Sequence, residues 1–487
     1  MSSQTQKKDL FYLHVIVYFL LTFAIGLLPP IGVTSYGMKI IGVFLGLIYG
    51  WTFLGFVWPS LFSMVALGFT GYDTPPNIIA AGIGHPTVLF TIFVCIFVEY
   101  CRASGLNDTM AKWLLSRNLF IGRPWIFFFV ILIGTFVISI AVGAVGAVFI
   151  ISGILYTMCE EIGYEKGNSF PAYLLAGVCI AGVLSFAASP WLGQILLGIM
   201  TLDTVSGGTC AISYAAIMIV ALPLCLITIA FYTLLVRFVF RPDVAPMTRL
   251  TPDYLKTIEK SMHINTEQKI AATALIVFML FMLIPGFLPK ETAAANFFSK
   301  FSLSASVALI LAILSIVRVD KKPILDFVTC AKNGVSWPIV IMLGAAMPIS
   351  TALDADGTGV SELLTTLLGS LLNGDNVLRF LVIFIVICVI ATQFTHNVTI
   401  VLVGVPILWN ICQMTNLNPV GSCILLFLAS SIAFATPAAS TVGALSFANA
   451  EWIGMKNAFQ AGIGATILAL IVLLLVGLPI VMLTVGI

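Results

Sequence analysis

The sequence predicts an all-α polytopic membrane protein with about eleven transmembrane helices and two re-entrant hairpins in an inverted repeat. Composition is the first reason: 60% of the 487 residues are hydrophobic and only 9% are charged, with a mean hydropathy of +1.13. Such a composition excludes a soluble globular domain. The second reason is the length of the apolar stretches, since a helix needs about 20 apolar residues to cross a bilayer. The third is a pair of interrupted apolar segments 252 positions apart, at 137 and 389.

Apolar stretches of membrane-spanning length follow one another along the chain. We expect spans at 11–28, 37–52, 54–70, 86–101, 172–200, 211–238, 270–288, 302–318, 335–353, 419–449 and 459–485. Two further stretches, 124–158 and 378–411, are expected to enter the membrane and return to the same side as hairpins. The apolar runs are continuous rather than alternating, which disfavours membrane-spanning strands. The lipid bilayer is therefore the first predicted partner.

The two interrupted segments, Val137–Ala147 and Val389–Thr399, align without a gap. The same offset aligns further identical residues, namely Pro86 with Pro338, Val88 with Val340, Ala103 with Ala355 and Gly105 with Gly357. Interrupted hydrophobic segments at corresponding places in two halves are typical of secondary transporters and indicate where the substrate binds. The repeat therefore predicts transport.

The positive charges predict the topology. With the N-terminus in the cytoplasm and both hairpins returning, 18 of the 22 Lys and Arg residues lie on the inner side. The four that lie outside are Lys39, Lys290, Lys300 and Arg379. This bias predicts a multi-pass protein of the plasma (inner) membrane with an extracytoplasmic C-terminus. It also gives the two halves opposite orientations, so register and charge both indicate an inverted repeat.

The chain divides into two halves joined by a linker. The expected parts are a first half 1–240 with hairpin 124–158 and broken helix 172–200, a proline-containing cytoplasmic linker 241–269, and a second half 270–487 with hairpin 378–411 and broken helix 419–449. Pro190 and Pro437 interrupt the two broken helices, because proline lacks an N–H and clashes with the preceding turn. Within a bilayer, the backbone groups freed in this way need protein or a wet cavity to satisfy them.

The hairpin tips and the helix breaks form the predicted substrate site. A helix begins at each tip, and its unpaired N–H groups and partial positive charge favour a carboxylate or another anion. The candidate residues are Gly143, Ala144, Val145 and Gly146 at the first tip, Thr395, His396, Asn397, Val398 and Thr399 at the second, Ser189 in the first break, and Thr436, Pro437 and Ala438 in the second. A lone Ser or Thr in a membrane helix can instead bond to its own backbone.

His396 is the one histidine within the two hairpins, and an ionisable group at membrane depth predicts function. If it is protonated when an anion binds, it supplies positive charge or carries a coupling proton. The alternative is a neutral imidazole held by a hydrogen bond. Burial opposes the charge and a bound carboxylate favours it, so the sequence leaves both states open.

Other functions fit the sequence less well. A cation/proton antiporter would place a carboxylate at a tip or a break, but 137–155, 183–196, 389–407 and 433–445 contain neither Asp nor Glu. A membrane-embedded enzyme would need paired acids or a metal-ligand cluster, and Glu160-Glu161 is the one adjacent acidic pair; no metal-ligand spacing accompanies it. A primary pump is excluded within this chain because no Gly-x-x-x-x-Gly-Lys-Ser/Thr loop is present. We therefore expect no enzymatic activity, no catalytic residue and no nucleic-acid partner.

From about residue 80 to residue 470 the chain resembles the divalent-anion/sodium symporter (DASS) family of the ion-transporter superfamily, the dicarboxylate and sulfate carriers. The resemblance rests on Trp337–Gly357, on Gln393–Thr399 where the family carries Ser-Asn-Thr, on Ala435–Ala438, and on Trp452, Ile453 and Lys456. It implies a homodimer with a fixed scaffold domain and a transport domain that moves like an elevator. It also implies that tips and breaks hold the carboxylates, with sodium near Thr395, Asn397, Thr436 and Gly193.

The tips depart from the family pattern. In the second tip only Asn397 remains, with His396 at the Ser position and Val398 at the Thr position. In the first tip the three positions are Ala144, Val145 and Gly146, which have no side-chain ligand for sodium. The predicted function is therefore secondary active transport of small organic anions, foremost di- or tricarboxylates, by an elevator mechanism with anion exchange. Sodium- or proton-coupled symport is the alternative.

Overall fold

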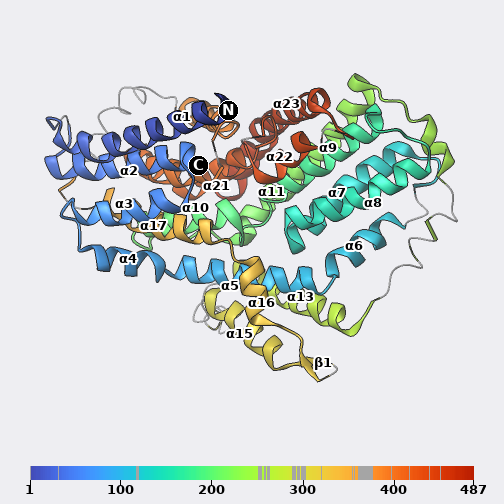
Figure 1. The fold of residues 1–487 in the computed structure, drawn as a ribbon, viewed down its shortest axis with the longest axis horizontal. Coiled ribbons are helices and arrows are strands. Elements are labelled where there is room, and N and C mark those ends of the chain that lie inside the picture. The colour runs from blue at the N-terminus through green and yellow to red at the C-terminus, as the bar shows by residue number, and fades with distance from the viewer. Residues whose placement is uncertain are drawn as a thin grey trace.

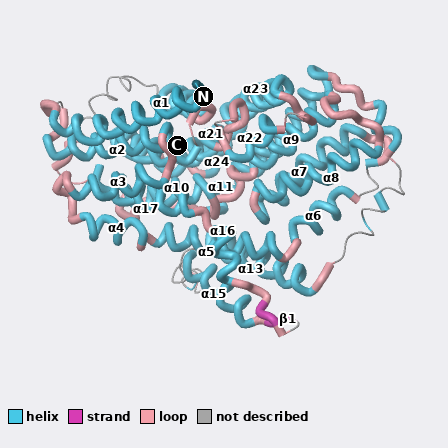
Figure 2. Tube along the Cα trace, in the orientation of Figure 1, coloured by secondary structure: helices cyan, strands magenta, loops and turns pink. Residues whose placement is uncertain are grey.

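Helices make up most of the computed structural model (Figure 2), and the described residues also form one short pair of strands. The structure describes all residues except 1, 31, 117–119, 251–254, 257–258, 260–263, 288–291, 293–296, 298–302, 320, 354, 356, 360–376, 396, 416, 438, 450 and 487. His396 and Ala438 of the predicted site therefore lie outside the described residues.

The first half runs from α1 to the short helices that precede the linker (Figure 1). Its elements are α1 (Ser2–Phe19), the π-turn η1 (Leu20–Ala24), the 3₁₀ turn η2 (Ile25–Leu27), α2 (Ser35–Phe53), α3 (Val57–Gly68), α4 (Pro75–Ile83), α5 (Pro86–Ala103), α6 (Leu106–Leu115), α7 (Pro124–Val142), α8 (Ala144–Glu161), α9 (Ser169–Leu184), α10 (Gly193–Val205), α11 (Tyr214–Leu235) and η4 (Val236–Phe240).

The second half follows the 3₁₀ turn η5 (Ala245–Arg249). Its elements are α13 (Thr266–Phe287), α15 (Leu303–Ile316), the strands β1 (Arg318–Val319) and β2 (Lys322–Pro323), α16 (Phe327–Gly334), α17 (Trp337–Leu353), α19 (Val377–Ala391), α20 (Asn397–Thr415), α21 (Pro419–Ser430), α22 (Thr441–Ala448), α23 (Met455–Val472), η6 (Leu473–Gly477) and α24 (Leu478–Thr484).

Every apolar stretch expected from the sequence contains a helix or a broken pair of helices. Hairpin 124–158 is α7 and α8, hairpin 378–411 is α19 and α20, and the two broken helices are α9–α10 and α21–α22. The short helices α4, α6 and α16 were not expected, and α13 begins at Thr266, inside the segment 241–269 that the sequence assigned to the linker. By length and composition, six helices of the described residues could cross a membrane, or seven if α16 and α17, bent by 72°, count as one span.

Local sequence signals explain where several helices begin. The side chains of Thr34, Ser213, Asp326, Asn418 and Ser440 each accept a hydrogen bond from a backbone N–H in the first turn that follows. Such N-caps satisfy donors that a helix leaves unpaired. Proline occupies the first turn of α4, α7 and α21, where its missing N–H costs nothing.

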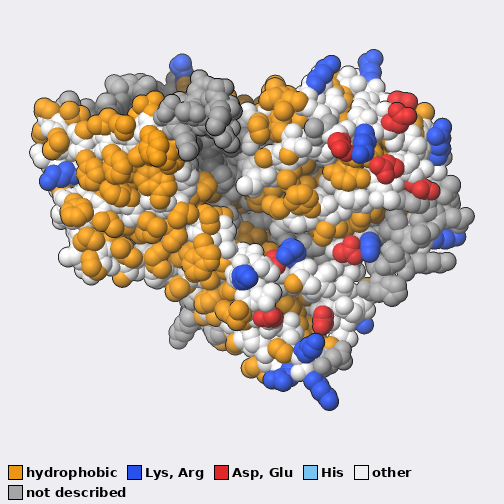
Figure 3. Space-filling model, in the orientation of Figure 1, with side chains coloured by type: hydrophobic (Ala, Val, Ile, Leu, Met, Phe, Trp, Pro, Cys, Tyr) orange, Lys and Arg blue, Asp and Glu red, His pale blue; other side chains and the backbone are white. Residues whose placement is uncertain are grey.

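The helices form two groups along the long axis of the molecule. In Figure 1, α1–α4 and α17 lie toward the left, α6–α9 and α23 lie toward the right, and α5 runs below the centre. Hydrophobic side chains cover the visible face over α1–α4, whereas charged side chains gather at the right end and the lower edge (Figure 3). Broad apolar cover on one face is the surface expected of a protein embedded in lipid.

Helices of each half pack against helices of the other half. Helix α17 of the second half packs against α3 and α4 of the first half, and α5 of the first half packs against α15 and α16 of the second. The starts of α4 and α16, Pro75 and Phe327, are 252 positions apart. The starts of α5 and α17 are 251 positions apart, which is one residue less. The packing is therefore reciprocal, as a two-fold repeat requires.

A glycine at the same repeat position makes each of these contacts close. A Cβ on Gly82 of α4 would lie 2.0 Å from the carbonyl oxygen of Gly344 in α17. A Cβ on Gly334 of α16 would lie 2.5 Å from Cβ of Glu99 and 2.7 Å from the carbonyl oxygen of Cys95, both in α5. Because Gly82 and Gly334 are themselves 252 positions apart, the repeat extends to the packing of single residues.

We predict that Gly82→Ala and Gly334→Ala each destabilise the protein, by about 1–3 kcal/mol, because the added methyl group forces backbones apart. Gly153→Ala in α8 is the matched control, since a Cβ there would meet nothing within 4 Å. Thermal unfolding of the detergent-purified variants measures the effect. Equal melting temperatures for all three variants would contradict the reciprocal close packing.

Candidate functional site

The first hairpin turns at a single glycine. Gly143, with φ +94°, is both the C-cap of α7 and the residue before α8, and a side chain is strained at that angle. Ala144 is buried, Val145 is 43% exposed and Gly146 is half-buried. One turn before the tip, the buried hydroxyl of Ser139 has no hydrogen-bond partner among the described residues. The tip therefore offers the backbone N–H groups that begin α8 and one neighbouring hydroxyl.

The second hairpin turns through Thr392–Thr395 before α20 begins at Asn397. Asn397, Val398 and Thr399 are buried, and the Asn397 side-chain oxygen accepts a hydrogen bond of 3.0 Å from the Val398 N–H. Thr395 is half-buried. This tip therefore places polar side chains, as well as backbone N–H groups, at the start of a helix.

The first break is held by its own hydroxyl groups. Ser185 donates to the carbonyl oxygen of Gly182 at 2.7 Å, and Ser189 donates to that of Ser185 at 2.8 Å. The segment then turns at Gly193, with φ +59°, into α10. Ser189, predicted to contact substrate, thus bonds to its own backbone here, which is the alternative the sequence left open.

The second break is held by side chains from the second tip. Gln393 donates through Nε2 to the carbonyl oxygens of Val389, at 2.8 Å, and Ile432, and its Oε1 accepts from the Ala435 N–H at 2.9 Å. The hydroxyl of Thr436 donates to the backbone carbonyl oxygen of Gln393. These bonds lock the tip of α19–α20 onto the unwound segment between α21 and α22.

Further contacts complete the second break. The Thr392 hydroxyl donates to the Ser430 carbonyl oxygen at 3.1 Å. The Ser440 hydroxyl donates to the Ala433 carbonyl oxygen and accepts from the Gly443 N–H, both at 3.0 Å. Pro437, in the middle of the break, is exposed. The carbonyl oxygens of Ile432 and Ala433 and the N–H of Ala435 therefore have side-chain partners, as buried backbone groups require.

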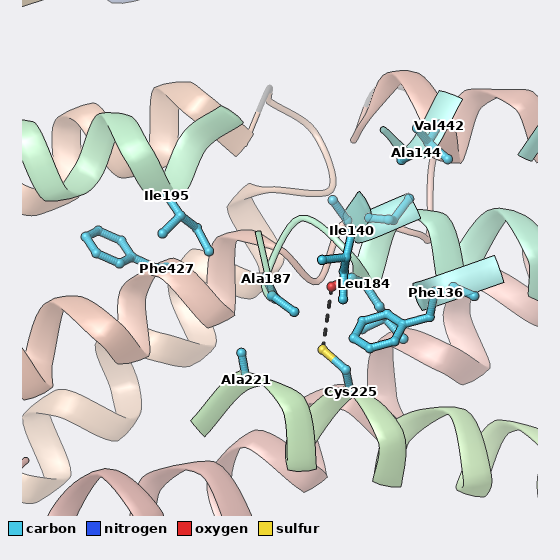
Figure 4. Close-up of a cluster of buried hydrophobic side chains, with 14 of the residues drawn as sticks. Phe136, Ile140, Ala144, Leu184, Ala187, Ile195, Ala221, Cys225, Phe427 and Val442 are labelled. Carbon is cyan, nitrogen blue, oxygen red and sulfur yellow. Dashed lines mark hydrogen bonds between the residues drawn. The ribbon is translucent and has the colours of Figure 1, made fainter. Parts of the chain in front are cut away.

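Each hairpin meets the broken helix of the other half. A Cβ on Gly182, at the end of α9, would lie 2.6 Å from Val148 of α8 and 3.1 Å from Val442 of α22. Figure 4 shows Ala144 and Val442 side by side, with Ile140 and Leu184 below them. The first tip therefore lies where α9 ends and α22 begins.

The second pair is formed by α10 and α20. A Cβ on Gly198 of α10 would lie 2.6 Å from Val401 of α20 and 2.2 Å from Phe427 of α21. Near the start of α10, Gln194 donates through Nε2 to the Ser431 hydroxyl at 3.0 Å. Gly198 and Val401 both lie within two turns of their helix starts, so α10 and α20 contact each other close to both N-termini. Together with α8 and α22, four helices begin around the tips and the breaks.

A cavity of about 230 Å³ lies between α8, α9 and α22. Its polar groups are Ser152, Tyr156 and Asn449, and the Asn449 side chain donates to the Tyr156 hydroxyl at 2.7 Å. Its walls include Phe149 and Leu175. Close by, Lys166 and Glu451 form an exposed ion pair of 2.5 Å, and this partner lowers the pKa of Glu451. The cavity follows α8 away from the first tip and offers uncharged hydrogen-bonding groups.

Sequence reasoning missed Gln393 and Gln194 as site residues, although each is an amide in an otherwise apolar run. Both are buried, and both hold the second break. An amide buried in an apolar segment must find partners, and that signal was readable from the sequence.

No group of three or more His, Cys, Asp or Glu side chains that could hold a metal occurs in the described part of the chain.

Comparisons with known proteins agree with a transporter. The uncharacterised transporter B0285.6 of Caenorhabditis elegans is 24% identical over 129 residues, which are 26% of this chain and 22% of that protein. The chain thus matches about a fifth of the length of this curated relative. The crystal structure of the YdaH transporter of Alcanivorax borkumensis, described as having an unusual topology, shares the fold with a TM-score of 0.58 and 11% identity, over 84% of this chain and 88% of that one.

A family model described as a citrate transporter (CitMHS) matches residues 40–305 and 298–485. Together these segments include most of the sequence and both halves of the repeat. The narrower resemblance to the divalent-anion/sodium symporters stays a prediction. The chain belongs to the citrate transporter family.

Proposed function

We propose that the protein is a secondary active transporter of small organic anions, foremost di- and tricarboxylates such as citrate. The observation that carries the proposal is that α8, α10, α20 and α22 each begin at a tip or a break, and that packing and hydrogen bonds join these segments across the two halves. Unpaired N–H groups and the helix dipole favour negative charge at such a place. Family membership supports a carboxylate as the anion.

The substrate site consists of the two tips with the breaks behind them. Asn397 and Thr399, both buried at the start of α20, are proposed to donate hydrogen bonds to one carboxylate. The N–H groups of Ala144, Val145 and Gly146 are proposed to bind the remaining charge, together with His396 of the predicted second tip. The segments 137–155, 183–196, 389–407 and 433–445 contain no acidic side chain that would repel an anion, which also argues against a cation/proton antiporter.

We propose that the site moves as one body, in the manner of an elevator. The contacts that form it lie within one group of helices, because Gln393, Gln194 and Thr392 join the second tip, α10 and the second break. The fixed scaffold would consist of α5 and α17 and of the helices that pack against them, namely α3, α4, α15 and α16. In this proposal the protein is a homodimer of the plasma membrane with a cytoplasmic N-terminus.

Anion exchange is the proposed mode, since the first tip has no side-chain oxygen for sodium and His396 adds charge at the second. Cation-coupled symport is a second candidate, and one observation favours it. The hydroxyl of Thr436 and the carbonyl oxygen of Gln393 lie together at the second tip, and oxygens of this kind bind small hard cations. Thr395, Asn397 and Gly193 are the further groups that would belong to such a sodium site.

Uptake into proteoliposomes tests the function. We expect radiolabelled citrate or succinate to enter vesicles preloaded with unlabelled citrate, at a rate that does not depend on a sodium gradient. Uptake into empty vesicles that requires sodium or a proton gradient would replace exchange by symport. No uptake of any di- or tricarboxylate under these conditions would contradict the proposed substrate class.

We predict that Asn397→Ala lowers carboxylate uptake at least tenfold, because a hydrogen bond to a charged group contributes about 1.5–3 kcal/mol. Thr415→Ala is the matched control, since Thr415 lies at the other end of α20 and its hydroxyl donates to the Ile411 carbonyl oxygen within the helix. Gel filtration and the melting temperature check folding. Uptake by Asn397→Ala at the rate of the control would remove the second tip from the site.

A further inference from the structure

A groove opens on the apolar side of the molecule where α1 gives way to irregular turns. The π-turn η1 and the 3₁₀ turn η2 follow α1, and beside them a cavity of about 190 Å³ lies against α2 and α3. Its walls are mainly apolar and include Phe23, Leu27, Val43 and Phe69. Lys39 is its one charged lining residue.

Two glycine contacts explain this shape. A Cβ on Gly46 of α2 would lie 2.1 Å from the Thr22 hydroxyl, so the π-turn presses closely onto α2. Beyond it, Gly26 leaves room for the side chain of Lys39, whose Cγ would lie 2.9 Å from a Cβ at that position. The lysine stem therefore crosses Gly26, which lets a long side chain bury its methylenes and keep its ammonium group at a polar boundary.

The polar groups of the groove differ in what they can still bind. The Thr22 hydroxyl donates to the Tyr18 carbonyl oxygen at 2.8 Å, and the Thr70 hydroxyl donates to that of Leu67 at 2.7 Å. None of the three ion pairs formed by the described residues includes Lys39, and the lysine is exposed. The ammonium group is therefore the part of the groove that would attract a ligand, and the ligand would be an anion.

The surroundings indicate an occupant that is apolar along most of its length. Phe19, Phe23, Leu27 and Phe69 are exposed next to the groove, and Figure 3 shows hydrophobic side chains covering the molecule over α1–α4. In a bilayer, such a surface meets acyl chains. The ammonium group attracts an anion and the apolar walls favour acyl chains, so the groove matches a lipid that carries an anionic headgroup.

We propose that this groove is a binding site for an anionic phospholipid. Its phosphate would contact Lys39, and one acyl chain would lie along Phe23, Leu27 and Phe69. The site is separate from the tips and the breaks and does not rest on the proposed transport function. It would tie α1–α3 to the membrane at a fixed depth.

Native mass spectrometry of the full chain tests the proposal. The protein is reconstituted in an equal mixture of phosphatidylglycerol and phosphatidylcholine, and the lipids that remain bound are counted. We expect wild type to retain phosphatidylglycerol about fivefold in excess, which corresponds to the attraction of one close pair of unit charges in water. Lys39→Ala should lose this preference and Lys39→Arg should keep it. Arg379→Ala, which removes an exposed cation at the start of α19, is the control and should keep it too.

A second variant tests the groove without changing its charge. Ala66 is a buried lining residue, so Ala66→Phe should fill the cavity and reduce retention of both lipids, with gel filtration and the melting temperature checking the fold. Equal retention of the two lipids by wild type, or an unchanged preference in Lys39→Ala, would overturn the proposal. A change of oligomeric state in Lys39→Ala with no change in bound lipid would also overturn it, because the occupant would then be a second copy of the chain.

Discussion

The structure depends on satisfying the backbone of two helices that are broken inside an apolar interior. Each break frees N–H and C=O groups, and each such group that is buried and left unpaired costs about 1–3 kcal/mol. The second break meets this requirement with side chains of the hairpin beside it, Gln393 and Thr392, while its own Thr436 donates to the hairpin's Gln393 carbonyl oxygen. The hydrogen bonds that satisfy the break therefore also hold the hairpin tip in position.

The exchange of helices between halves determines how the site is assembled. Because α4 packs on α17 and α16 packs on α5, neither half can bury its apolar faces alone. The same reciprocity continues at the site. Helix α8 of the first half packs against α22 of the second, and α20 of the second half packs against α10 of the first. The site therefore exists only when both halves are folded together.

The two ends of the site differ chemically although the backbone repeats. The first tip presents the N–H groups of Ala144, Val145 and Gly146 at the start of α8. The second presents Asn397 and Thr399 with Gln393 behind them. The first break is held by serines that bond within it, whereas the second is held from outside. A bound anion with several carboxylates would meet backbone donors at one end and side-chain donors at the other.

The sequence by itself determined the helical class, the positions of both hairpins and both breaks, and the offset of the repeat. These features depend on local causes, namely apolar run length, proline and glycine at the interruptions, and register. It did not determine the roles of Gln393 and Gln194, the back-bond of Ser189 or the short helices α4 and α16. Gln194 meets Ser431 across 237 positions, Gln393 meets Ile432 across 39, and α4 and α16 each pack on a helix of the other half. Only the tertiary structure decided them, because a polar side chain in an apolar run carries no record of the backbone group that will satisfy it.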